Sequence, residues 1–378
     1  MLPDEPGVSP RSNRDRPKRQ ISSRSLVSLL VSVLMAVMSA CLTLWQRGQA
    51  VLSVRRAAAK AGHPGNVRRG QLHMSASTLQ NQRIAVIGLG SMGFGMATSL
   101  KRAGRAVTGC DVSADAVARF VKDGGAGANT PAEAARDADI VVSVVVNAAQ
   151  TEAILFGKDG AAETMPKGSV FVSSATMDPE VARRLAKQLE ATGRHYLDAP
   201  ISGGAQRAAQ GELTILASGS AAAFAKARPA LDAMAAKLYE LGDAAGQGAA
   251  FKMINQLLAG VHIAAASEAM AFAAKQGLDI RKVYEVITAS AGNSWMFENR
   301  MPHVLDGDYT PRSAVEIFVK DLGIIQDMAR SARFPVPVSA AALQMFLMTA
   351  AAGMGRDDDA SVARMYAQVT GVKLPGDK

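Results

Sequence analysis

The 378-residue chain contains little cysteine, and its two cysteines cannot build a disulfide framework. Cys41 lies in an N-terminal stretch of unusual composition, and Cys110 is the only cysteine after residue 80. Secreted domains that depend on disulfides carry several cysteines at regular spacings. The composition therefore fits a reducing compartment, and we expect a cytoplasmic protein.

The part of the chain beyond residue 80 also lacks a net charge. The whole chain has a formal net charge of +9. Residues 1–80 hold twelve Lys and Arg against three acidic residues, so the two signs balance over 81–378. Nucleic-acid binding leaves a basic patch on the folded domain. Because the charges over 81–378 balance, the sequence gives no indication of such a basic patch, and no nucleic-acid partner is predicted.

Histidines at metal-ligand spacing are missing as well. The chain has five histidines, and none has a neighbouring ligand at the short spacings typical of zinc sites. No metal is predicted. His262 follows Asn255 by seven residues on the same expected helix face, and we interpret it as a packed or interface histidine.

The first eighty residues differ from all that follows, and we interpret 1–80 as an N-terminal extension. Residues 1–25 are rich in Pro, Ser and Arg, a composition typical of disorder. Leu26–Trp45 has no charge and is long enough to span a bilayer. Three explanations stay open: a gene start set too early, with the true start near Met74; a genuine membrane anchor; and a cleaved signal. With a genuine anchor, the protein would be membrane-anchored.

The next pattern is a buried strand, a glycine-rich turn and a helix. Arg83–Gly88 is a short β-branched run of the kind that forms buried parallel strands, and Phe94–Ala103 favours helix. The glycines would permit a tight turn and a close approach of backbone to a pyrophosphate at the helix N-terminus. The turn satisfies G-x-G-x-x-G with Gly88, Leu89, Gly90, Ser91, Met92 and Gly93.

Asp111 strengthens this interpretation as dinucleotide binding. It ends the predicted strand Ala106–Cys110, about twenty residues after the glycines, where an acidic residue accepts the ribose hydroxyls. Val112 and Ser113 follow without an arginine to receive a 2′-phosphate, which favours NAD over NADP. Two alternatives stay open: a flavin or nucleotide fold with the same turn, and an aspartate that only caps the helix after Ser113.

Strands and helices continue to alternate, which predicts a Rossmann-type doubly wound parallel sheet. Val146 and Asn147 end a strand and should lie under the cofactor, at the carboxyl edge of the sheet. Asp178 and Pro179 are a typical helix start. The predicted elements are a helix over Ala114–Lys122, strands over Asp139–Val146 and Ser169–Ser174, and a helix over Pro179–Ala191.

A second glycine loop follows a strand that begins at His195. Ser202, Gly203 and Gly204 combine free backbone N–H groups with one hydroxyl donor, which suits a carboxylate. An ordinary turn is the alternative.

Lys252 and Asn255 lie three residues apart in a stretch that favours helix, so both occupy one face. A lysine and an amide that enter an apolar pocket together suggest a proton-transfer group and its orienting partner. A lysine that extends to solvent is the alternative.

The strand pattern stops at Gly248, and an all-helical C-terminal domain is predicted after it. We expect a NAD-binding domain over 81–245 and a helical substrate and oligomerisation domain over 246–378, with the site in the cleft between them. The first helix is nearly uncharged and should be buried, for example against another subunit. The predicted helices are Ala249–Lys275, 280–290, 313–331, 336–352 and 358–369.

Four motifs together resemble the β-hydroxyacid dehydrogenase family, which includes 3-hydroxyisobutyrate dehydrogenase and tartronate semialdehyde reductase. The resemblance covers about 82–370. The motifs are the turn Gly88–Gly93, the stretch Asp198–Gly204, Gly246-x-Gly248-x-x-x-Lys252-x-x-Asn255, and Lys320-Asp321-Leu322.

The resemblance implies a role for each matching residue. Lys252 would be the general acid/base, and Asn255 would hold the substrate hydroxyl or carboxylate. Ser202, Gly203 and Gly204 would bind the carboxylate. Thr176 would contact the nicotinamide ribose, and Lys320 would reach cofactor and substrate, unless it is a solvated charge paired with Asp321. Family members commonly form homodimers or homotetramers.

Three segments, 173–179, 251–258 and 292–300, are most similar to the L-threonate dehydrogenase branch of the family. That branch implies NAD-dependent oxidation of the C2 hydroxyl of a four-carbon sugar acid, L-threonate to 2-oxo-tetronate. Ala175 replaces the hydroxyl residue usual in 3-hydroxyisobutyrate enzymes. The alternatives are 3-hydroxyisobutyrate dehydrogenase, tartronate semialdehyde reductase and, from another class, a non-catalytic dinucleotide-sensing module.

Overall fold

A six-stranded parallel sheet forms the first part of the computed structural model, which describes residues 82–376. The predicted extension over 1–80, with its apolar segment, lies outside the described residues. The strand order is β3-β2-β1-β4-β5-β6, the doubly wound arrangement predicted from the sequence. The strands are Arg83–Ile87 (β1), Ala106–Cys110 (β2), Ala126–Ala128 (β3), Ile140–Ser143 (β4), Val170–Ser173 (β5) and His195–Asp198 (β6).

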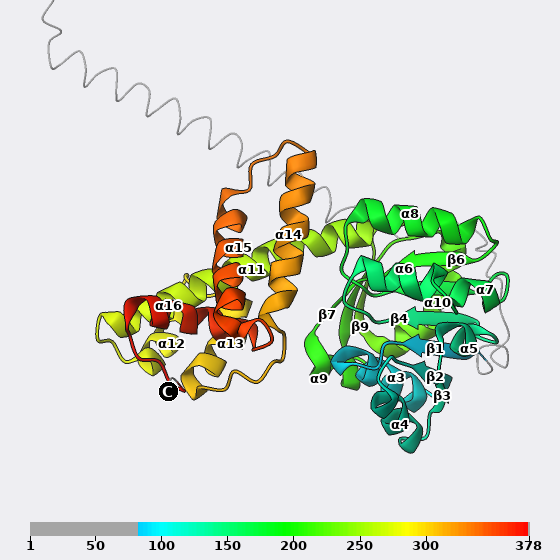
Figure 1. Cartoon of the computed structure of the whole chain (residues 1–378), viewed down its shortest axis with the longest axis horizontal. Coiled ribbons are helices and arrows are strands. Elements are labelled where there is room, and N and C mark those ends of the chain that lie inside the picture. The colour runs from blue at the N-terminus through cyan, green and yellow to red at the C-terminus, as the bar shows by residue number, and fades with distance from the viewer. Residues whose placement is uncertain (1–81, 377–378) are drawn as a thin grey trace, which may run out of the picture. The chain divides into compact units, whose positions relative to one another are not determined.

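Helices flank this sheet (Figure 1). Ile84 and Val86 of β1 contribute to one hydrophobic cluster, and Ala85 and Ile87 contribute to another. Because successive side chains of a strand point to opposite faces, both faces are covered and the strands contain continuous apolar runs. The helices are Ser91–Arg102 (α3), Ala114–Lys122 (α4), Pro131–Ala135 (α5), Ala148–Phe156 (α6), Ala161–Thr164 (α7), Pro179–Glu190 (α8) and Ala221–Met234 (α10).

Two of the predicted boundaries that differ from the structure lie next to the glycine turn and at the end of β4. Helix α3 begins at Ser91 rather than Phe94, because the last residues of the glycine turn already form its first turn. Strand β4 ends at Ser143, although the β-branched run continues to Val146. Its neighbours β1 and β5 end opposite Ser143, so the residues beyond have no partner strand.

A small second sheet, which the sequence analysis does not predict, continues from β6. Its strands are Ile201–Ser202 (β7), Leu213–Ala217 (β8) and Ala235–Glu240 (β9), and Gly204–Gln210 forms helix α9. Strand β8 pairs antiparallel with β7 and parallel with β9. Asp198 and Ser218 form a bridge that joins the end of β6 to the end of β8.

From Gln247 to the end of the described residues the structure is helical, as predicted. One helix was not predicted, α13, whose sequence contains Pro302 and therefore reads as an interrupted pattern. The helices are Gln247–Lys275 (α11), Ile280–Thr288 (α12), Trp295–Asp306 (α13), Val315–Ser331 (α14), Pro337–Thr349 (α15) and Val362–Thr370 (α16), with a π-helical turn over Ala350–Met354 and a 3-10 turn over Asp359–Ser361.

Helix α11 joins the part of the chain that contains the sheets to the helical C-terminal part. Its 29 residues extend over roughly 43 Å at 1.5 Å per residue. It contacts β6, β8 and α8 as well as the helices α13, α14, α15 and α16. Met253, Ile263 and Met270 bury its inner side in the two hydrophobic clusters of the helical part.

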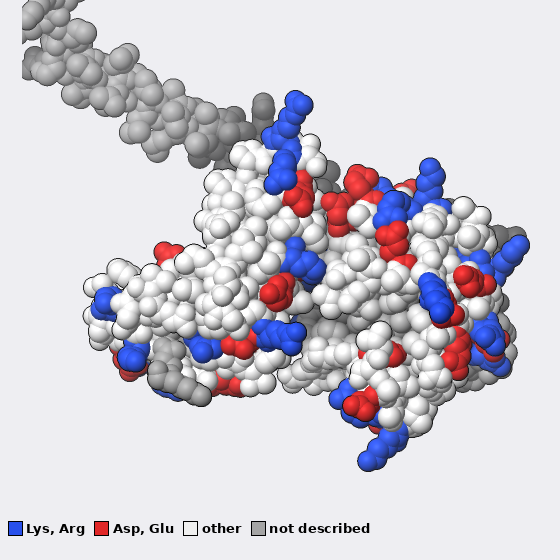
Figure 2. Space-filling view, viewed as in Figure 1, with Lys and Arg blue, Asp and Glu red and all other residues white. Residues whose placement is uncertain are grey.

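Within the described residues, two helical segments are long and apolar enough to cross a membrane, Gln247–Lys275 and Pro337–Met354. Length and composition alone are weak evidence, because core helices of soluble proteins pass the same test. Lys, Arg, Asp and Glu side chains are interspersed on the face that Figure 2 shows.

Candidate active site

The glycine turn has the geometry of a pyrophosphate cradle. Gly88 has φ +96, and an added Cβ would lie 2.3 Å from the carbonyl oxygen of Val144. A Cβ on Gly93 would lie 1.8 Å from the carbonyl oxygen of Gly88. Gly90 is the N-cap of α3 and supplies no side-chain cap, and a Cβ there would meet no atom within 4 Å. The turn is therefore open, with free N–H groups of a helix start facing it, and it fits a dinucleotide.

Asp111 connects this turn to the next loop. Its Oδ2 accepts a hydrogen bond from the backbone N–H of Leu89 at 2.6 Å, and its Oδ1 accepts one from Ser113 at 2.8 Å. Ser113 caps α4 by accepting from the N–H of Ala116, so the alternative of an aspartate that only caps this helix is wrong. Each carboxylate oxygen has a further lone pair, so Asp111 keeps acceptor capacity for a ribose.

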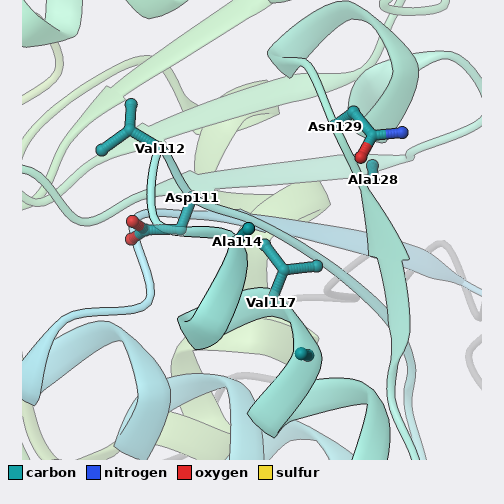
Figure 3. A pocket seen from close by; sticks show the side chains of 7 residues that line it. Asp111, Val112, Ala114, Val117, Ala128 and Asn129 are labelled. Carbon is teal, nitrogen blue, oxygen red and sulfur yellow. The ribbon is translucent and has the colours of Figure 1, made fainter.

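A pocket lies beside Asp111 (Figure 3). Val112 and Ala114 come from the loop and start of α4, and Asn129 follows β3. Small and apolar side chains next to a carboxylate suit an adenosine, with the base against the apolar atoms and the ribose at the acid. The full lining is Asp111, Val112, Ala114, Val117, Ala118, Ala128 and Asn129.

Val146 and Asn147 lie in the loop between β4 and α6, just past the carboxyl edge of the sheet. Val146 is half exposed, and its N–H donates to Gln150 Oε1 at 2.9 Å. The Asn147 side chain caps α6 by accepting from the N–H of Gln150. Both residues therefore have local structural roles at the position predicted for cofactor contact.

The second glycine loop connects β7 to α9. Gly203 has φ +137 and Gly204 has φ +78, which side chains rarely adopt, so the loop needs both glycines. Ser202 is partly buried and pairs with Thr214 of β8.

Helix α9, which follows this loop, packs against α3. An added Cβ on Gly95 would lie 2.7 Å from the backbone nitrogen of Ala209, so the two helices approach to backbone contact.

Lys252 is buried on α11, with 7% of its surface exposed. Burial lowers the pKa of its ammonium group to about 8; the nearby Lys320 acts in the same direction, and Asp321 opposes both. A group with this pKa exchanges protons readily near neutral pH. The solvent-exposed lysine considered above is wrong for this residue.

A chain of polar contacts runs past Lys252. Asn255 Nδ2 donates to Gln256 Oε1 at 3.0 Å, and Gln256 Nε2 donates to Asp321 Oδ2 at 2.5 Å. Lys320 Nζ lies 2.7 Å from Asp321 Oδ1 and donates to the carbonyl oxygen of Thr176 at 3.2 Å. Three predicted site residues, Asn255, Lys320 and Thr176, are thus joined into one network.

Gln256 was not predicted as a site residue, and Asp321 was considered only as the partner of Lys320. Both side chains are buried, with exposures of 7% and 1%. The available signal was the i, i+4 spacing of Lys252 and Gln256, which places them on one helix face. Lys320 does pair with Asp321, but the pair is mostly buried rather than solvated.

Among residues 82–376, no group of three His, Cys, Asp or Glu could hold a metal ion. Cys110 is buried, and its pKa is raised to about 11 by that burial and by Asp111 and Glu133, so its thiol stays protonated.

Comparison with known proteins identifies the family. Residues 83–242 match the model of the NAD binding domain of 6-phosphogluconate dehydrogenase. Residues 246–366 match the model described as NAD-binding of NADP-dependent 3-hydroxyisobutyrate dehydrogenase. The L-threonate dehydrogenase of Cupriavidus necator is 53% identical over 296 residues, 78% of this chain and 99% of that protein. The chain belongs to the β-hydroxyacid dehydrogenase family.

Two further family members are similar to this chain over most of their own length. The mitochondrial 3-hydroxyisobutyrate dehydrogenase of Rattus norvegicus is 31% identical over 295 residues, 76% of this chain and 88% of that protein. A crystal structure described as 3-hydroxyisobutyrate dehydrogenase from Salmonella typhimurium has a TM-score of 0.72 at 49% identity, and it covers 75% of this chain and 100% of that one.

The protein is an NAD-dependent hydroxyacid dehydrogenase. The resemblance, the Rossmann-type fold with its helical second part, and the cofactor predicted from the sequence are confirmed.

Proposed function

We propose that this dehydrogenase oxidises the C2 hydroxyl of L-threonate to give 2-oxo-tetronate. Relatives at 46–53% identity carry the name L-threonate dehydrogenase, and the mitochondrial 3-hydroxyisobutyrate dehydrogenase of Rattus norvegicus is more distant at 31%. The Salmonella typhimurium structure described as 3-hydroxyisobutyrate dehydrogenase is 49% identical, which keeps that substrate as the alternative. The observation that carries the chemistry is the burial of Lys252, because it lowers the pKa of the only lysine on α11 near the polar network.

Lys252 is the general acid/base in this proposal. NAD, when bound, supplies the hydride acceptor. Neutral Lys252 would take the proton of the C2 hydroxyl as the C–H bond at C2 gives up its hydride to the acceptor, and the C2 carbonyl would form. Asn255 orients the hydroxyl or carboxylate from the end of the polar network, and Ser202, Gly203 and Gly204 bind the carboxylate through backbone N–H groups and one hydroxyl.

The proposed cofactor contacts follow the parts of the site described above. The glycine turn binds the pyrophosphate, Asp111 the adenosine ribose, and Thr176 and Lys320 the nicotinamide end. Val146 and Asn147 contribute backbone at the carboxyl edge. The turn residues are Gly88, Leu89, Gly90, Ser91, Met92 and Gly93.

The direction of the pH dependence follows from the protonation state that each reaction needs. Oxidation needs neutral Lys252, so kcat/KM, which reports the free enzyme, should rise with pH to a plateau, with a midpoint at about 8. Reduction of the 2-oxo acid needs the ammonium form and should fall over the same range. Initial rates of NADH formation and consumption between pH 6 and 10 measure both. Parallel profiles in the two directions would exclude Lys252 as the group that titrates.

The substrate assignment is tested by a screen of C3–C6 hydroxyacids with NAD and with NADP, followed by NADH absorbance. We expect the highest kcat/KM with L-threonate and NAD. The alternative substrates are 3-hydroxyisobutyrate and, in the reductive direction, tartronate semialdehyde. Ala175, which is buried, replaces the hydroxyl residue that 3-hydroxyisobutyrate enzymes usually have there, which weakens an assignment to that methyl-branched substrate. A preference for either alternative by more than tenfold would overturn the assignment.

We also propose a homo-oligomer, a dimer or tetramer. Phe251, Ile254 and Leu258 of α11 are 54%, 61% and 49% exposed, and their spacing places them on one face. An apolar helix face of this kind is typical of a subunit contact. Light scattering should give a mass above that of one chain, and Ile254→Lys should lower it. A wild-type protein that is monomeric at micromolar concentration would contradict the proposal.

We further propose the predicted division into an NAD-binding domain over 81–245 and a helical substrate and oligomerisation domain over 246–378. We also propose a cytoplasmic location, which fits an NAD-dependent enzyme. If the apolar segment over 26–45 acts as a membrane anchor, the protein is membrane-anchored instead.

A further inference from the structure

The helix that carries Lys252 has no cap of its own. Its N-cap residue is Gly246, in a left-handed conformation at φ +100, which has no side chain to accept from the first turn. The first N–H groups of a helix have no partner within the helix and need acceptors from elsewhere. For α11 these acceptors come from the end of the sheet.

Asp198, the last residue of β6, supplies most of them. Its carboxylate is 1% exposed, and Oδ2 accepts from the N–H of Gly246 at 2.9 Å and of Ala249 at 2.8 Å. The Ser218 hydroxyl lies 3.4 Å from the same oxygen and accepts from the N–H of Gly248 at 2.9 Å. Two side chains at the ends of β6 and β8 therefore cap the helix in place of its own residues.

The helix start also touches the strand backbones. A Cβ on Gly248 would lie 2.4 Å from the carbonyl oxygen of Leu216 and 3.0 Å from that of Asp198. Only glycine lets α11 come this close. Gly248 is thus explained by the packing of the helix on the sheet, whereas Gly246 is explained by its left-handed conformation and by the carbonyl oxygen of Pro179 on α8, 2.9 Å from an added Cβ.

Asp198 connects the loop proposed to bind the substrate carboxylate with the start of the helix that carries Lys252. Ser202 of the carboxylate loop follows it by four residues, and Lys252 follows Ala249 by three. We infer that Asp198 is a positioning residue, which sets the place of Lys252 relative to the Ser202–Gly204 loop by capping α11. The inference rests on the role of Lys252 in the proposed function, and it does not depend on the identity of the hydroxyacid.

The charges around the cap are consistent with this role. Burial raises the pKa of Asp198 to about 6, while the N–H groups of Ala249 and Gly246, Ser218 and the charge of Arg183 on α8 oppose the rise. At the pH where Lys252 is neutral, Asp198 is ionised and interacts favourably with the helix N-terminus. The charged groups that act on Lys252 itself are Asp321 and Lys320 of α14.

The test is the pH at which Lys252 loses its proton in Asp198 variants of the full-length protein. Acetic anhydride modifies only neutral amines, so mass spectrometry of the Lys252 peptide after labelling from pH 6 to 11 gives the midpoint without any substrate. In Asp198→Ala the first turns of α11 lose their cap and Lys252 becomes better hydrated. We expect the midpoint to rise by about one pH unit from about 8 toward the lysine value of 10.5.

Turnover is the second measurement, with whichever hydroxyacid the wild-type enzyme uses. We expect Asp198→Ala to lower kcat by about 100-fold, because a displacement of about 1 Å costs that much, with an NAD Kd within about twofold of wild type. Asp198→Asn keeps the acceptor oxygen and should restore both the midpoint and most of kcat. Ser218→Ala removes the acceptor for Gly248 and the hydroxyl that donates to Asp198 Oδ2 at 3.4 Å, but leaves the Asp198 cap in place, and should give a smaller shift in the same direction.

Asp279→Ala is the matched control. Asp279 caps α12 by accepting from the N–H of Arg281 at 2.9 Å, and α12 carries no site residue. It should lower the melting temperature and leave the Lys252 midpoint unchanged. If Asp198→Ala behaves like this control, or if Asp198→Asn does not rescue it, the inference is wrong. If Asp198→Ala does not fold, the Asp198→Asn and Ser218→Ala midpoints decide. A wild-type protein that turns over no hydroxyacid would contradict the proposed function, while the labelling midpoints would still test the inference.

Discussion

The cofactor turn and the lysine site of this dehydrogenase are built in different ways. The turn over Gly88–Gly93 and Asp111 comes from one strand–helix–strand unit, and the hydrogen bond from Leu89 to Asp111 that holds it joins residues 22 positions apart. The lysine site joins Thr176, Lys252 with Gln256, and Lys320 with Asp321, from segments far apart in the chain. A local site depends on backbone shape, whereas an assembled site depends on how helices pack. Substitutions should therefore affect the two in separable ways.

The largest expected effect is a loss of turnover at the lysine site without a loss of NAD binding at the cofactor turn. Lys252→Ala should lower kcat by about 1,000-fold or more, since it removes the proposed general acid/base, and should leave the NAD Kd within about twofold. Steady-state kinetics and NAD titration by calorimetry measure the two quantities. Lys282→Ala, which alters an exposed lysine of α12, is the control and should retain wild-type kcat. An active Lys252→Ala enzyme would remove the mechanism.

The next effect tests how the turn is built. Gly93→Ala places a Cβ against the Gly88 carbonyl oxygen and should destabilise the cofactor-free protein, by several degrees in melting temperature. Gly90→Ala has open space around its Cβ and should leave the melting temperature unchanged while weakening NAD binding. Differential scanning fluorimetry with and without NAD distinguishes the two variants. Equal melting temperatures for both would contradict the packing argument.

Asp111→Ala should weaken NAD binding by about tenfold to 100-fold, because it removes an acceptor for the ribose and the bond that holds the N–H of Leu89. The effect should appear in the NAD Kd, with kcat at saturating NAD nearly unchanged. The matched control is Asp115→Ala, which removes an exposed carboxylate from the first turn of the nearby helix α4. An unchanged NAD Kd in Asp111→Ala would refute the ribose role.

The smallest expected effect concerns the polar network of the assembled site. Gln256→Leu keeps the volume of the side chain but breaks the link from Asn255 to Asp321, and should lower kcat/KM for the hydroxyacid by about tenfold. NAD binding should not change. Wild-type kcat/KM in this variant would mean that Asn255 is oriented without the network.

Much of the local structure could be predicted from the sequence. The strands before Gly88 and Asp111, and the helix opened by Asp178 and Pro179, follow from patterns a few residues long. Their β-branched runs and cap residues act on neighbouring backbone, so no distant contact is needed to read them.

The missed features depend on distant partners. Strand β8 exists as part of a sheet because β7 and β9 pair with it, and β4 ends where β1 and β5 end. The same holds for Gln256, whose importance arises only when α14 brings Asp321 to it. Short patterns cannot encode such pairings.

For this protein, the sequence by itself determined the family, the cofactor turn and the residue proposed to transfer the proton, because each depends on residue type at fixed short spacings. Only the tertiary structure decided that Lys252 is buried with a lowered pKa, and that Asp198 and Ser218 cap its helix. Burial and capping depend on which segments meet across long stretches of chain. The Gly246-x-Gly248 spacing is visible in the sequence, but its reasons are properties of the fold: Gly246 is left-handed and lies against α8, and Gly248 contacts the ends of β6 and β8.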